Sequence, residues 1–277
     1  MKKEFKQIYL KNLVTSIAIL SGIATLSMVF LSAKVPEWVK DYEWHYIIGF
    51  TLFNLVIAGL MSISKKQICL KLNHNTTAHI FVGDLFTQSG IIIIPVNEYF
   101  DTLVDENVVS KDTLHGKFIN QYFANNISEL DNKMNLALSN IIFEIDDERP
   151  IGKNKKYPLG TTIEIKKDDK TFFLVALTNF NENNRASVSK SKYQEVLAKL
   201  FDFIEQFSQG KIVNLPLIGG SNRAGLDISL KKRLECIILT ALFRNQLSLG
   251  ILNIVLTEKT LKEINLNKID LIIDAIK

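Results

Sequence analysis

The amino-acid sequence predicts an α/β protein in two parts: a two-helix transmembrane hairpin over residues 1–66 and a three-layer α/β/α domain over residues 67–277. Two uncharged apolar stretches in the first part predict the hairpin. In the second part, short apolar runs without polar alternation are separated by segments of helical periodicity. This pattern indicates a mixed, largely parallel sheet with helices on both faces.

Each apolar stretch is long enough to cross a bilayer as a helix. Leu13–Ala33 has 21 residues and Tyr46–Ser64 has 19, and at about 1.5 Å per residue the longer one reaches about 30 Å. A cleaved signal peptide is the alternative, because lysines precede the first stretch. That stretch is too long for such a peptide, however, and Leu31–Ala33 makes a poor cleavage site. We therefore predict spans at about 13–33 and 46–64.

Lysines flank the two stretches on the side of both termini. Lys2, Lys3, Lys6 and Lys11 precede the first stretch, and Lys65, Lys66 and Lys71 follow the second. The connecting loop has more acidic than basic residues and is rich in tryptophan and tyrosine, which suit the opposite membrane interface. Because cytoplasmic flanks carry the excess of lysine, we expect a multi-pass protein of the cell inner membrane with both termini in the cytoplasm.

Charge and cysteine content exclude several classes of function. The first 66 residues carry eight lysines and four acidic residues, and the rest carry 25 basic and 25 acidic residues, so the net charge of +4 belongs to the first part. A neutral domain does not predict nucleic-acid binding, which needs many phosphate contacts, and the lipid bilayer is the expected partner of the lysines. Cys69 and Cys236 are too few for a disulfide framework. The sequence shows no metal-binding cluster and no P-loop.

The expected strands and helices alternate along the second part. A short strand ends at Val82, and buried strands are expected over residues 91–96, 172–177, 212–217 and 251–256. Helices are expected around 114–125 and 128–142, over 193–207, from about Ser229 to residue 242, and near 269–276. Ser191 and Gln194 are predicted as a capping box for the third of these helices, with Gly210 as its stop.

Three loops follow these strands, where open α/β sheets bind their ligands. Val82–Phe86 contains Asp84, Pro95–Glu98 contains Asn97, and Pro216–Gly225 is rich in glycine and leads into a helix. Glycines let backbone amides approach an anion, the helix start adds a partial positive charge, and Arg223 adds a full one. The third loop therefore suits a diphosphate group.

Each candidate residue also has a purely structural interpretation. Asp84 and Asn97 are residue types that cap turns through bonds to their own nearby backbone. Arg223 can pair with Asp227 at the surface, a contact of little energetic value. His115 stands at a helix start and can be a partly buried surface residue. The Lys153–Lys156 run is interpreted as a solvated loop.

The order of these motifs resembles the macro domain family of ADP-ribose binders over most of residues 68–277. Gly83-Asp84-Leu85 is similar to the family's segment whose carboxylate meets the adenine amino group. Asn97 stands in the place of the asparagine that meets the distal ribose, and the late glycine loop is similar to the one that wraps the diphosphate. The resemblance implies a macro-like fold and these ligand-binding residues: Asp84, Leu85, Asn97, His115, Gly219, Gly220, Ser221, Asn222, Arg223 and Gly225.

The chain also departs from that family. Hydrolytic members carry a run of glycines shortly after the asparagine, whereas this chain has Tyr99-Phe100-Asp101-Thr102 and then Ser110–Gly116. We therefore assign no catalytic residue and expect a site reshaped for a modified ligand. With its two predicted spans, its Ser-x-x-x-Leu-His-Gly stretch and its Gly-Gly-Ser-Asn-Arg loop, the chain resembles the membrane effectors of Thoeris antiphage defence, the transmembrane and macro type.

The second resemblance implies a bacterial sensor that needs no cofactor or metal. Its ligand would be an ADP-ribose-derived signalling nucleotide made by a TIR-domain partner, with a histidine conjugate of ADP-ribose as the candidate. Binding would drive homo-oligomerisation, loss of membrane integrity and death of the infected cell. Two alternatives stay open: a membrane-anchored hydrolase of ADP-ribosyl groups, and a tethered adaptor that binds another protein.

Overall fold

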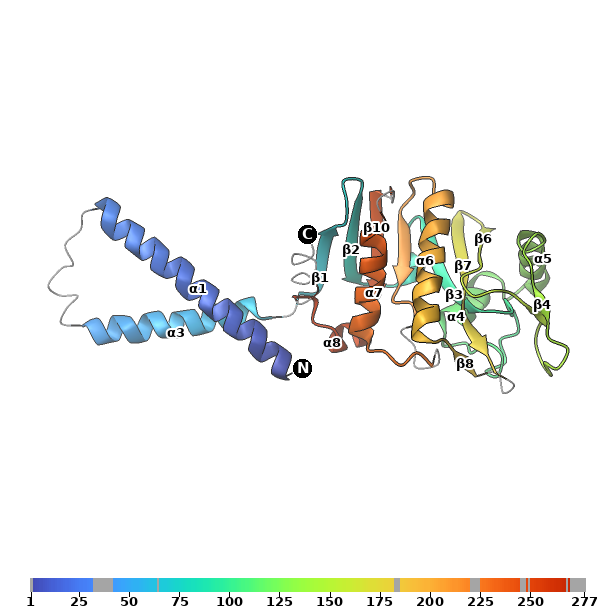
Figure 1. Cartoon of the computed structure of the whole chain (residues 1–277), viewed down its shortest axis with the longest axis horizontal. Helices are drawn as coiled ribbons and strands as arrows, with labels where there is room; N and C mark the ends of the chain where they lie inside the picture. The colour runs from blue at the N-terminus through green and yellow to red at the C-terminus, as the bar shows by residue number, and fades with distance from the viewer. Residues whose placement is uncertain are drawn as a thin grey trace. The chain divides into compact units, whose positions relative to one another are not determined.

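The computed structural model describes the chain except for residues 1, 32–41, 64, 182–184, 220–224, 245–247, 249, 268 and 270–277 (Figure 1). The chain divides into two compact units. One unit combines Met1–Lys65 with Asn265–Lys277, and the other is Lys66–Ile264. The end of the chain therefore belongs to the same unit as its beginning. Asn267 makes this link, because its side chain accepts from Lys65 N at 3.1 Å and donates to the Ile63 carbonyl at 3.1 Å.

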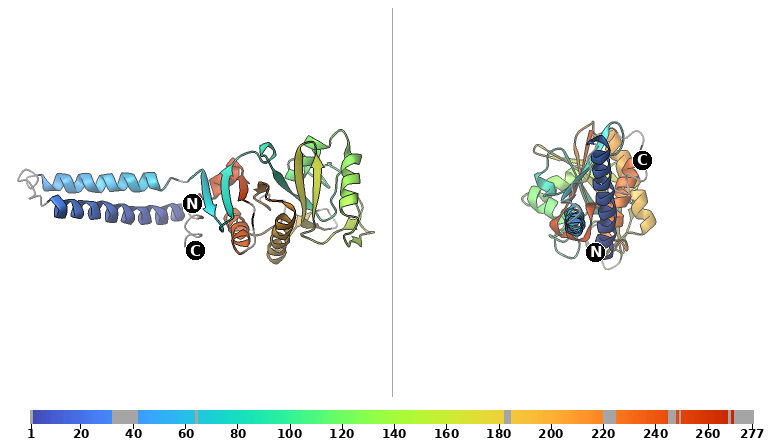
Figure 2. Two further views of the ribbon diagram at one scale, coloured as in Figure 1. Left: turned by 90° about the horizontal axis from the view of Figure 1, so that it is seen from above. Right: turned by 90° about the vertical axis from the view of Figure 1, so that its left-hand side faces the viewer.

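The first unit contains a pair of helices, α1 (Lys2–Leu31) and α3 (Glu43–Met61). They lie side by side, and polar side chains join them (Figure 2). Ser16 Oγ donates to Asn54 Oδ1 at 2.9 Å, and Asn12 Nδ2 donates to Ser62 Oγ at 3.1 Å. Within the described part of the chain, no helix combines the length and the apolar character that a membrane crossing needs, so the structure does not support the predicted spans at 13–33 and 46–64.

The second unit is built on a mixed sheet with the strand order β1-β2-β10-β9-β3-β7-β6, and β8 pairs with β7. Neighbouring strands from β2 to β7 in this order are parallel, whereas β1, β6 and β8 are antiparallel to their neighbours. The strands are β1 Gln67–Lys71, β2 Thr76–Val82, β3 Ile91–Asn97, β6 Thr162–Lys167, β7 Lys170–Phe180, β8 Ala186–Ser187, β9 Val213–Pro216 and β10 Gly250–Leu256. A separate antiparallel hairpin pairs β4 (Glu144–Ile145) with β5 (Lys155–Lys156).

Helices cover both faces of this sheet, which gives the three layers that the sequence predicts (Figure 2). α4 (Leu114–Tyr122) and α5 (Ile127–Ala137) pack on one face, and α6 (Lys190–Phe207) and α7 (Leu230–Leu242) on the other. Two shorter helices are η1 (Leu85–Thr87) and α8 (Glu258–Glu263). Ile91–Ile94 of β3 are fully buried, and burial of each such side chain contributes roughly 1.5–3 kcal/mol.

The structure confirms the predicted strands β3, β7, β9 and β10 and the predicted helices α4 to α7. The prediction that Ser191 and Gln194 form the capping box of α6 is wrong. The helix begins at Lys190, and its cap is Ser189, whose side chain accepts from Lys192 N at 3.2 Å. α5 ends at Ala137, earlier than residue 142. The helix predicted near 269–276 lies outside the described residues except for Ile269.

Candidate ligand site at the strand ends

The parallel strands bring the three predicted loops to one edge of the sheet. β2, β10, β9 and β3 run in the same direction, so Gly83, Glu98 and Leu217 leave the sheet at the same edge. This arrangement is the one in which α/β sheets bind ligands. Gly220, Ser221, Asn222 and Arg223 of the predicted glycine loop lie outside the described residues.

Asp84 lies at the surface of this edge. One carboxylate oxygen, Oδ1, accepts from Phe86 N at 2.9 Å and caps η1. Asp84 therefore caps a turn, as its structural interpretation predicts, and its carboxylate is also exposed at the surface. Leu85 follows Asp84 at this edge, and its side chain is 6% exposed and packs in the core.

Asn97 ends β3, but its side chain is directed into the protein. Only 3% of the residue is exposed. Its Nδ2 donates to Asp101 Oδ2 at 2.9 Å, and its Oδ1 accepts from Tyr99 N and Asp101 N at 3.1 and 3.3 Å. Both polar atoms thus have partners within the protein. Asn97 shapes the loop that follows β3, as a turn residue does.

Asp101 is the centre of a buried network that no pattern in the sequence predicts. It is fully buried and makes a two-pronged ion pair with Arg149, at 3.1 Å from Nη1 to Oδ1 and 2.7 Å from Nη2 to Oδ2. Lys153 N also donates to Oδ1, at 2.8 Å. Charged pairs of this geometry are strong and specific. The network ties the loop after β3 to the β4–β5 hairpin.

The side chains around this ion pair strengthen the same connection. The guanidinium of Arg149 lies 3.7 Å from the centre of the Tyr99 ring, and the Tyr99 hydroxyl donates to Asp146 at 2.5 Å. Lys153 Nζ donates to the Phe100 carbonyl at 2.9 Å. The interpretation of Lys153–Lys156 as a solvated loop is therefore wrong for Lys153. No sequence signal pairs Arg149 with Asp101, because they are far apart in the chain.

Glu98 and His115 are the other buried ionisable groups beside this loop. Burial raises the pKa of Glu98, whose Oε1 accepts from Phe180 N at 2.9 Å. Burial lowers the pKa of His115 to about 4, and its ring donates to the backbone of Asp101. In the neutral ring Nε2 is then an acceptor, and among the described residues it has no partner. The residue is 5% exposed, so ligand contact with this nitrogen requires local opening.

The Ser-x-x-x-Leu-His-Gly stretch has a structural explanation. Thr113 caps α4 by accepting from Gly116 N at 3.0 Å, and its hydroxyl donates to the Ser110 carbonyl at 2.7 Å. A Cβ on Gly116 would lie 2.2 Å from the Ser110 oxygen. The stretch therefore forms a compact helix start that holds His115 in the core.

We expect Gly116→Ala to lower the free energy of unfolding by about 1–3 kcal/mol, the usual effect of overpacking, because its neighbours are backbone atoms. Urea unfolding of the full chain measures the loss. Thr113→Ala removes the cap and the bond to the Ser110 carbonyl without adding volume, and it should cost about 1 kcal/mol. A Gly116→Ala variant as stable as the wild type would show that the backbone around Ser110 moves to accommodate the added Cβ without loss of stability.

The two described ends of the glycine loop need glycine. Gly219 and Gly225 have φ values of +72° and +59°, a region that other residues rarely adopt. A Cβ on Gly225 would lie 2.9 Å from the Ala186 carbonyl oxygen. Tyr193 donates to the Ile218 carbonyl at 3.0 Å and holds the start of the loop. Asp227, the alternative partner of Arg223, contacts Lys190 at 3.5 Å.

Comparison with known proteins identifies the family of the chain. Residues 78–255 match the family described as "Thoeris protein ThsA, Macro domain". The Thoeris protein ThsA of Bacillus amyloliquefaciens (strain Y2) is 30% identical over 200 residues, which cover 70% of this chain and 66% of that protein. The chain thus matches slightly less than two thirds of this relative. Within the described residues, no group of three or more His, Cys, Asp or Glu side chains is placed to hold a metal ion.

Solved structures with the same fold are macro domains. The Oceanobacillus iheyensis macrodomain with ADP has a TM-score of 0.53 and 13% identity and covers 76% of this chain and 97% of its own. The same macrodomain with MES bound has a TM-score of 0.54 and 14% identity, with 76% and 98% covered. At this identity the likeness shows the fold alone. The fold, the matched residues and the curated relative together show that the chain belongs to the family of the Thoeris protein ThsA macro domain.

Proposed function

We propose that this chain is an effector of Thoeris antiphage defence whose macro domain senses an ADP-ribose-derived nucleotide. The family membership supports the defence role. The observation that carries the ligand class is that an exposed carboxylate, Asp84, and a left-handed glycine, Gly219, follow parallel strands at one sheet edge.

The two loops supply complementary chemistry. The Asp84 carboxylate has one oxygen committed to Phe86 N, and the other accepts from the amino group of an adenine ring. Left-handed glycines let backbone amides face an anion without a side chain between them. In this proposal the glycine loop, including Gly220, Ser221, Asn222 and Arg223, binds the diphosphate. The protein acts as a sensor and not as an enzyme.

Asp84→Ala is expected to weaken ADP-ribose binding at least about tenfold, the effect of one lost charge-assisted hydrogen bond. Asp84→Asn keeps an acceptor for Phe86 N and separates loss of charge from loss of the η1 cap. Glu195→Ala, on the exposed side of α6, is the matched control. Calorimetric titration of the full chain with ADP-ribose and its amino-acid conjugates measures the affinities. Unchanged affinity in Asp84→Ala would rule out the adenine contact.

The same titration samples test the hydrolase alternative. A sensor returns its ligand unchanged, so intact nucleotide recovered after long incubation excludes hydrolysis. If no adenine nucleotide shifts the melting temperature of the full chain, the tethered adaptor becomes the better explanation.

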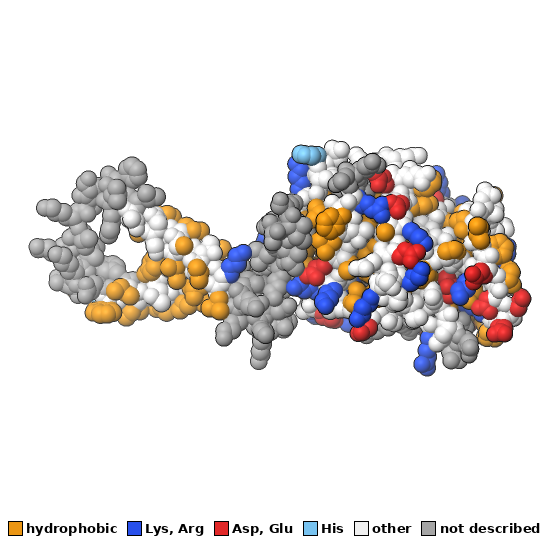
Figure 3. Space-filling view, in the orientation of Figure 1, with side chains coloured by type: hydrophobic (Ala, Val, Ile, Leu, Met, Phe, Trp, Pro, Cys, Tyr) orange, Lys and Arg blue, Asp and Glu red, His pale blue; other side chains and the backbone are white. Residues whose placement is uncertain are grey.

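The proposal places the helical hairpin in the inner membrane, with both termini in the cytoplasm. Three polar side chains of the hairpin, Ser16, Asn54 and Ser62, are buried between or within the helices, and the exposed hydroxyls of Thr15, Thr25 and Thr51 donate to carbonyls of their own helices. Apolar side chains face outward, as Figure 3 shows in orange. The exposed ones include Val14, Ile17, Ile19, Ile23, Ile47, Ile48, Leu52, Phe53, Val56 and Leu60. A surface with this inside-out polarity is stabilised by lipid and not by water.

In this proposal, a nucleotide made by a TIR-domain protein shifts the effector towards a homo-oligomer that disrupts the bilayer. A ligand shifts such an equilibrium only if it binds the assembled form more tightly. The test is addition of ADP-ribose conjugates to the protein in dye-loaded liposomes. Binding without a change in oligomer size or dye leakage would remove the effector part of the proposal.

A further inference from the structure

Arg233 is a buried arginine in the first turns of α7, the helix that follows the glycine loop. The residue is 6% exposed. Its guanidinium reaches back past the N-cap Ser229, because Nε donates to the Ile228 carbonyl at 2.9 Å and Nη2 donates to the Leu226 carbonyl. Both carbonyls belong to the segment that joins the glycine loop to α7. Arg233 therefore places a full positive charge beside this segment, at the start of the helix.

The charge of Arg233 has no counterion among the described residues. No carboxylate there pairs with the guanidinium, and Nη1 has no hydrogen-bond partner. Tyr193 lies nearby, but burial raises the pKa of its hydroxyl, which is neutral and donates to the Ile218 carbonyl. Burial also lowers the pKa of Arg233, although a guanidinium stays protonated in proteins. A buried cation without a partner costs free energy in the ligand-free protein.

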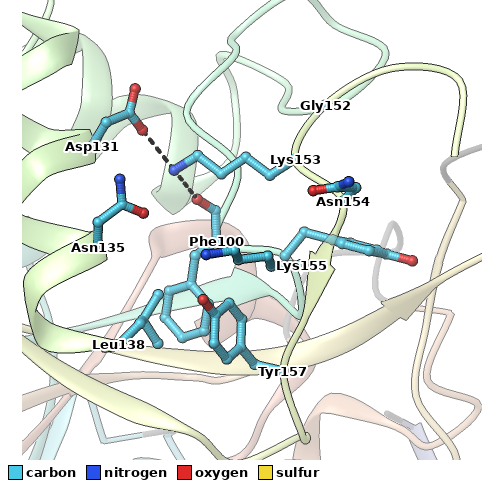
Figure 4. Close-up of a pocket in the computed structure, with 10 residues that line it drawn as sticks. Phe100, Asp131, Asn135, Leu138, Gly152, Lys153, Asn154, Lys155 and Tyr157 are labelled. Carbon is cyan, nitrogen blue, oxygen red and sulfur yellow. Dashed lines mark hydrogen bonds and ion pairs between the residues drawn. The ribbon is translucent and has the colours of Figure 1, made fainter. Parts of the chain in front are cut away.

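Two other cations of the same domain show the usual solution to this problem. Arg149 is buried and pairs with Asp101. Lys153 is half-buried and contacts Asp131 at 2.6 Å, in the pocket between α5 and the β4–β5 hairpin (Figure 4). Arg233 differs from both, and the partial positive charge at the start of α7 adds to its own charge. Two positive charges at one place are stabilised when an anion binds beside them.

The same guanidinium is connected to the base of the glycine loop. A Cβ on Gly219 would lie 3.2 Å from Leu226 Cδ2 and 3.5 Å from Tyr193 Cε2, so the two ends of the loop meet at these side chains. Arg233 binds the carbonyl of Leu226, and Tyr193 binds the carbonyl of Ile218. These contacts form a chain from Gly219 through Leu226 to Arg233. They bring the unpaired charge to the base of the loop.

We propose that Arg233 is the positioning residue that makes the glycine loop selective for a diphosphate. Its bonds to Leu226 and Ile228 hold the end of the loop, and its charge attracts the negative charges of the ligand from beneath the loop. The ligand class is a compound with two linked phosphate groups. The inference rests on the proposed function for the place of the ligand, and it adds the source of the selectivity for charge.

The test compares three ligands by calorimetric titration of the full chain: ADP-ribose, inorganic pyrophosphate, and adenosine, which has no phosphate. Arg233→Gln keeps an N–H donor where Nε stands and removes the charge. It is expected to weaken the binding of ADP-ribose and pyrophosphate at least about tenfold, and to leave the affinity for adenosine unchanged. Arg233→Lys keeps the charge and should retain most of the affinity for both diphosphates.

Lys232→Gln is the matched control, because it removes the same charge from an exposed position in the same turn of α7. It should bind all three ligands as the wild type does. Equal losses for adenosine and ADP-ribose in Arg233→Gln would give Arg233 a purely structural role and overturn the inference. Equal losses of diphosphate affinity in Arg233→Gln and Arg233→Lys would overturn it as well.

The same titrations separate this inference from the proposed function. If the wild type binds pyrophosphate but neither adenosine nor ADP-ribose, and Arg233→Gln loses that binding, the proposed function is contradicted and the inference stands. If neither diphosphate loses affinity in Arg233→Gln, which includes the case that neither binds the wild type, the inference is wrong.

Discussion

Replacement of Asp101 by alanine is expected to lower the free energy of unfolding by about 3–5 kcal/mol, the usual cost of removing one member of a buried ion pair. The side chains of Arg149 and Asp101 are 4% and 1% exposed, so water cannot replace the lost carboxylate. The change also leaves Asn97 Nδ2 and Lys153 N without their acceptor. Urea unfolding of the full chain, followed by circular dichroism, measures the difference.

Two further variants make this prediction specific. Asp101→Ala combined with Arg149→Met removes both charges, and it should recover a large part of the lost stability, since buried pairs replaced by apolar groups are often neutral. Asp227→Ala removes an exposed partner of Lys190 and should change stability by less than about 1 kcal/mol. Equal losses in the single and double variants would show that the ion pair is not the source of the effect.

The second large effect is a dependence of stability on pH through His115. Burial holds its pKa in the folded protein at about 4, compared with 6.5 in an unfolded chain. As the pH falls through this window, the unfolded chain binds a proton that the folded protein does not, so stability decreases. Above pH 6.5 this contribution is fully present, and it is lost by about pH 4. The full difference amounts to roughly 3 kcal/mol.

His115→Leu lacks the titrating ring and keeps an apolar side chain in the core. Its stability is therefore expected to fall less steeply than that of the wild type between pH 6.5 and 4, while carboxylates affect both proteins alike. Denaturant midpoints at intervals of pH, together with NMR titration of the His115 ring, measure the two quantities. If stability falls with pH in parallel for the two proteins, or if the His115 ring is protonated near pH 6.5, the lowered pKa of His115 is contradicted.

The central strands and helices could be predicted because their patterns are strong. β3 is buried on both faces and therefore reads as an unbroken apolar run. α6 shows apolar residues at helical spacing along its whole length. The edge strands β1 and β6 were missed, because polar or charged residues interrupt their apolar runs: β1 buries only alternate side chains, and β6 ends in two lysines. The cap of α6 was misplaced since several serines precede it, and only the backbone geometry selects Ser189.

Only the part of the site that depends on the positions of strand ends could be predicted from the sequence. Loops after parallel strands gather at one edge, which allowed the sequence to place Asp84 and the ends of the glycine loop together. The turn interpretation of Asn97 came from its residue type, but its bond to Asp101 was not predictable, since Asp101 is itself held by Arg149 from a hairpin distant in sequence. Pairings between segments far apart in sequence follow from the tertiary structure, and no periodicity or motif records them.

The bonds between Asn267 and the backbone of Ile63 and Lys65 have a mechanical consequence. The polypeptide leaves the helical unit and returns to it at neighbouring points, so the macro domain is attached by two covalent tethers instead of one. Any rearrangement inside the macro domain that separates Lys66 from Ile264 would therefore pull directly on the helical unit.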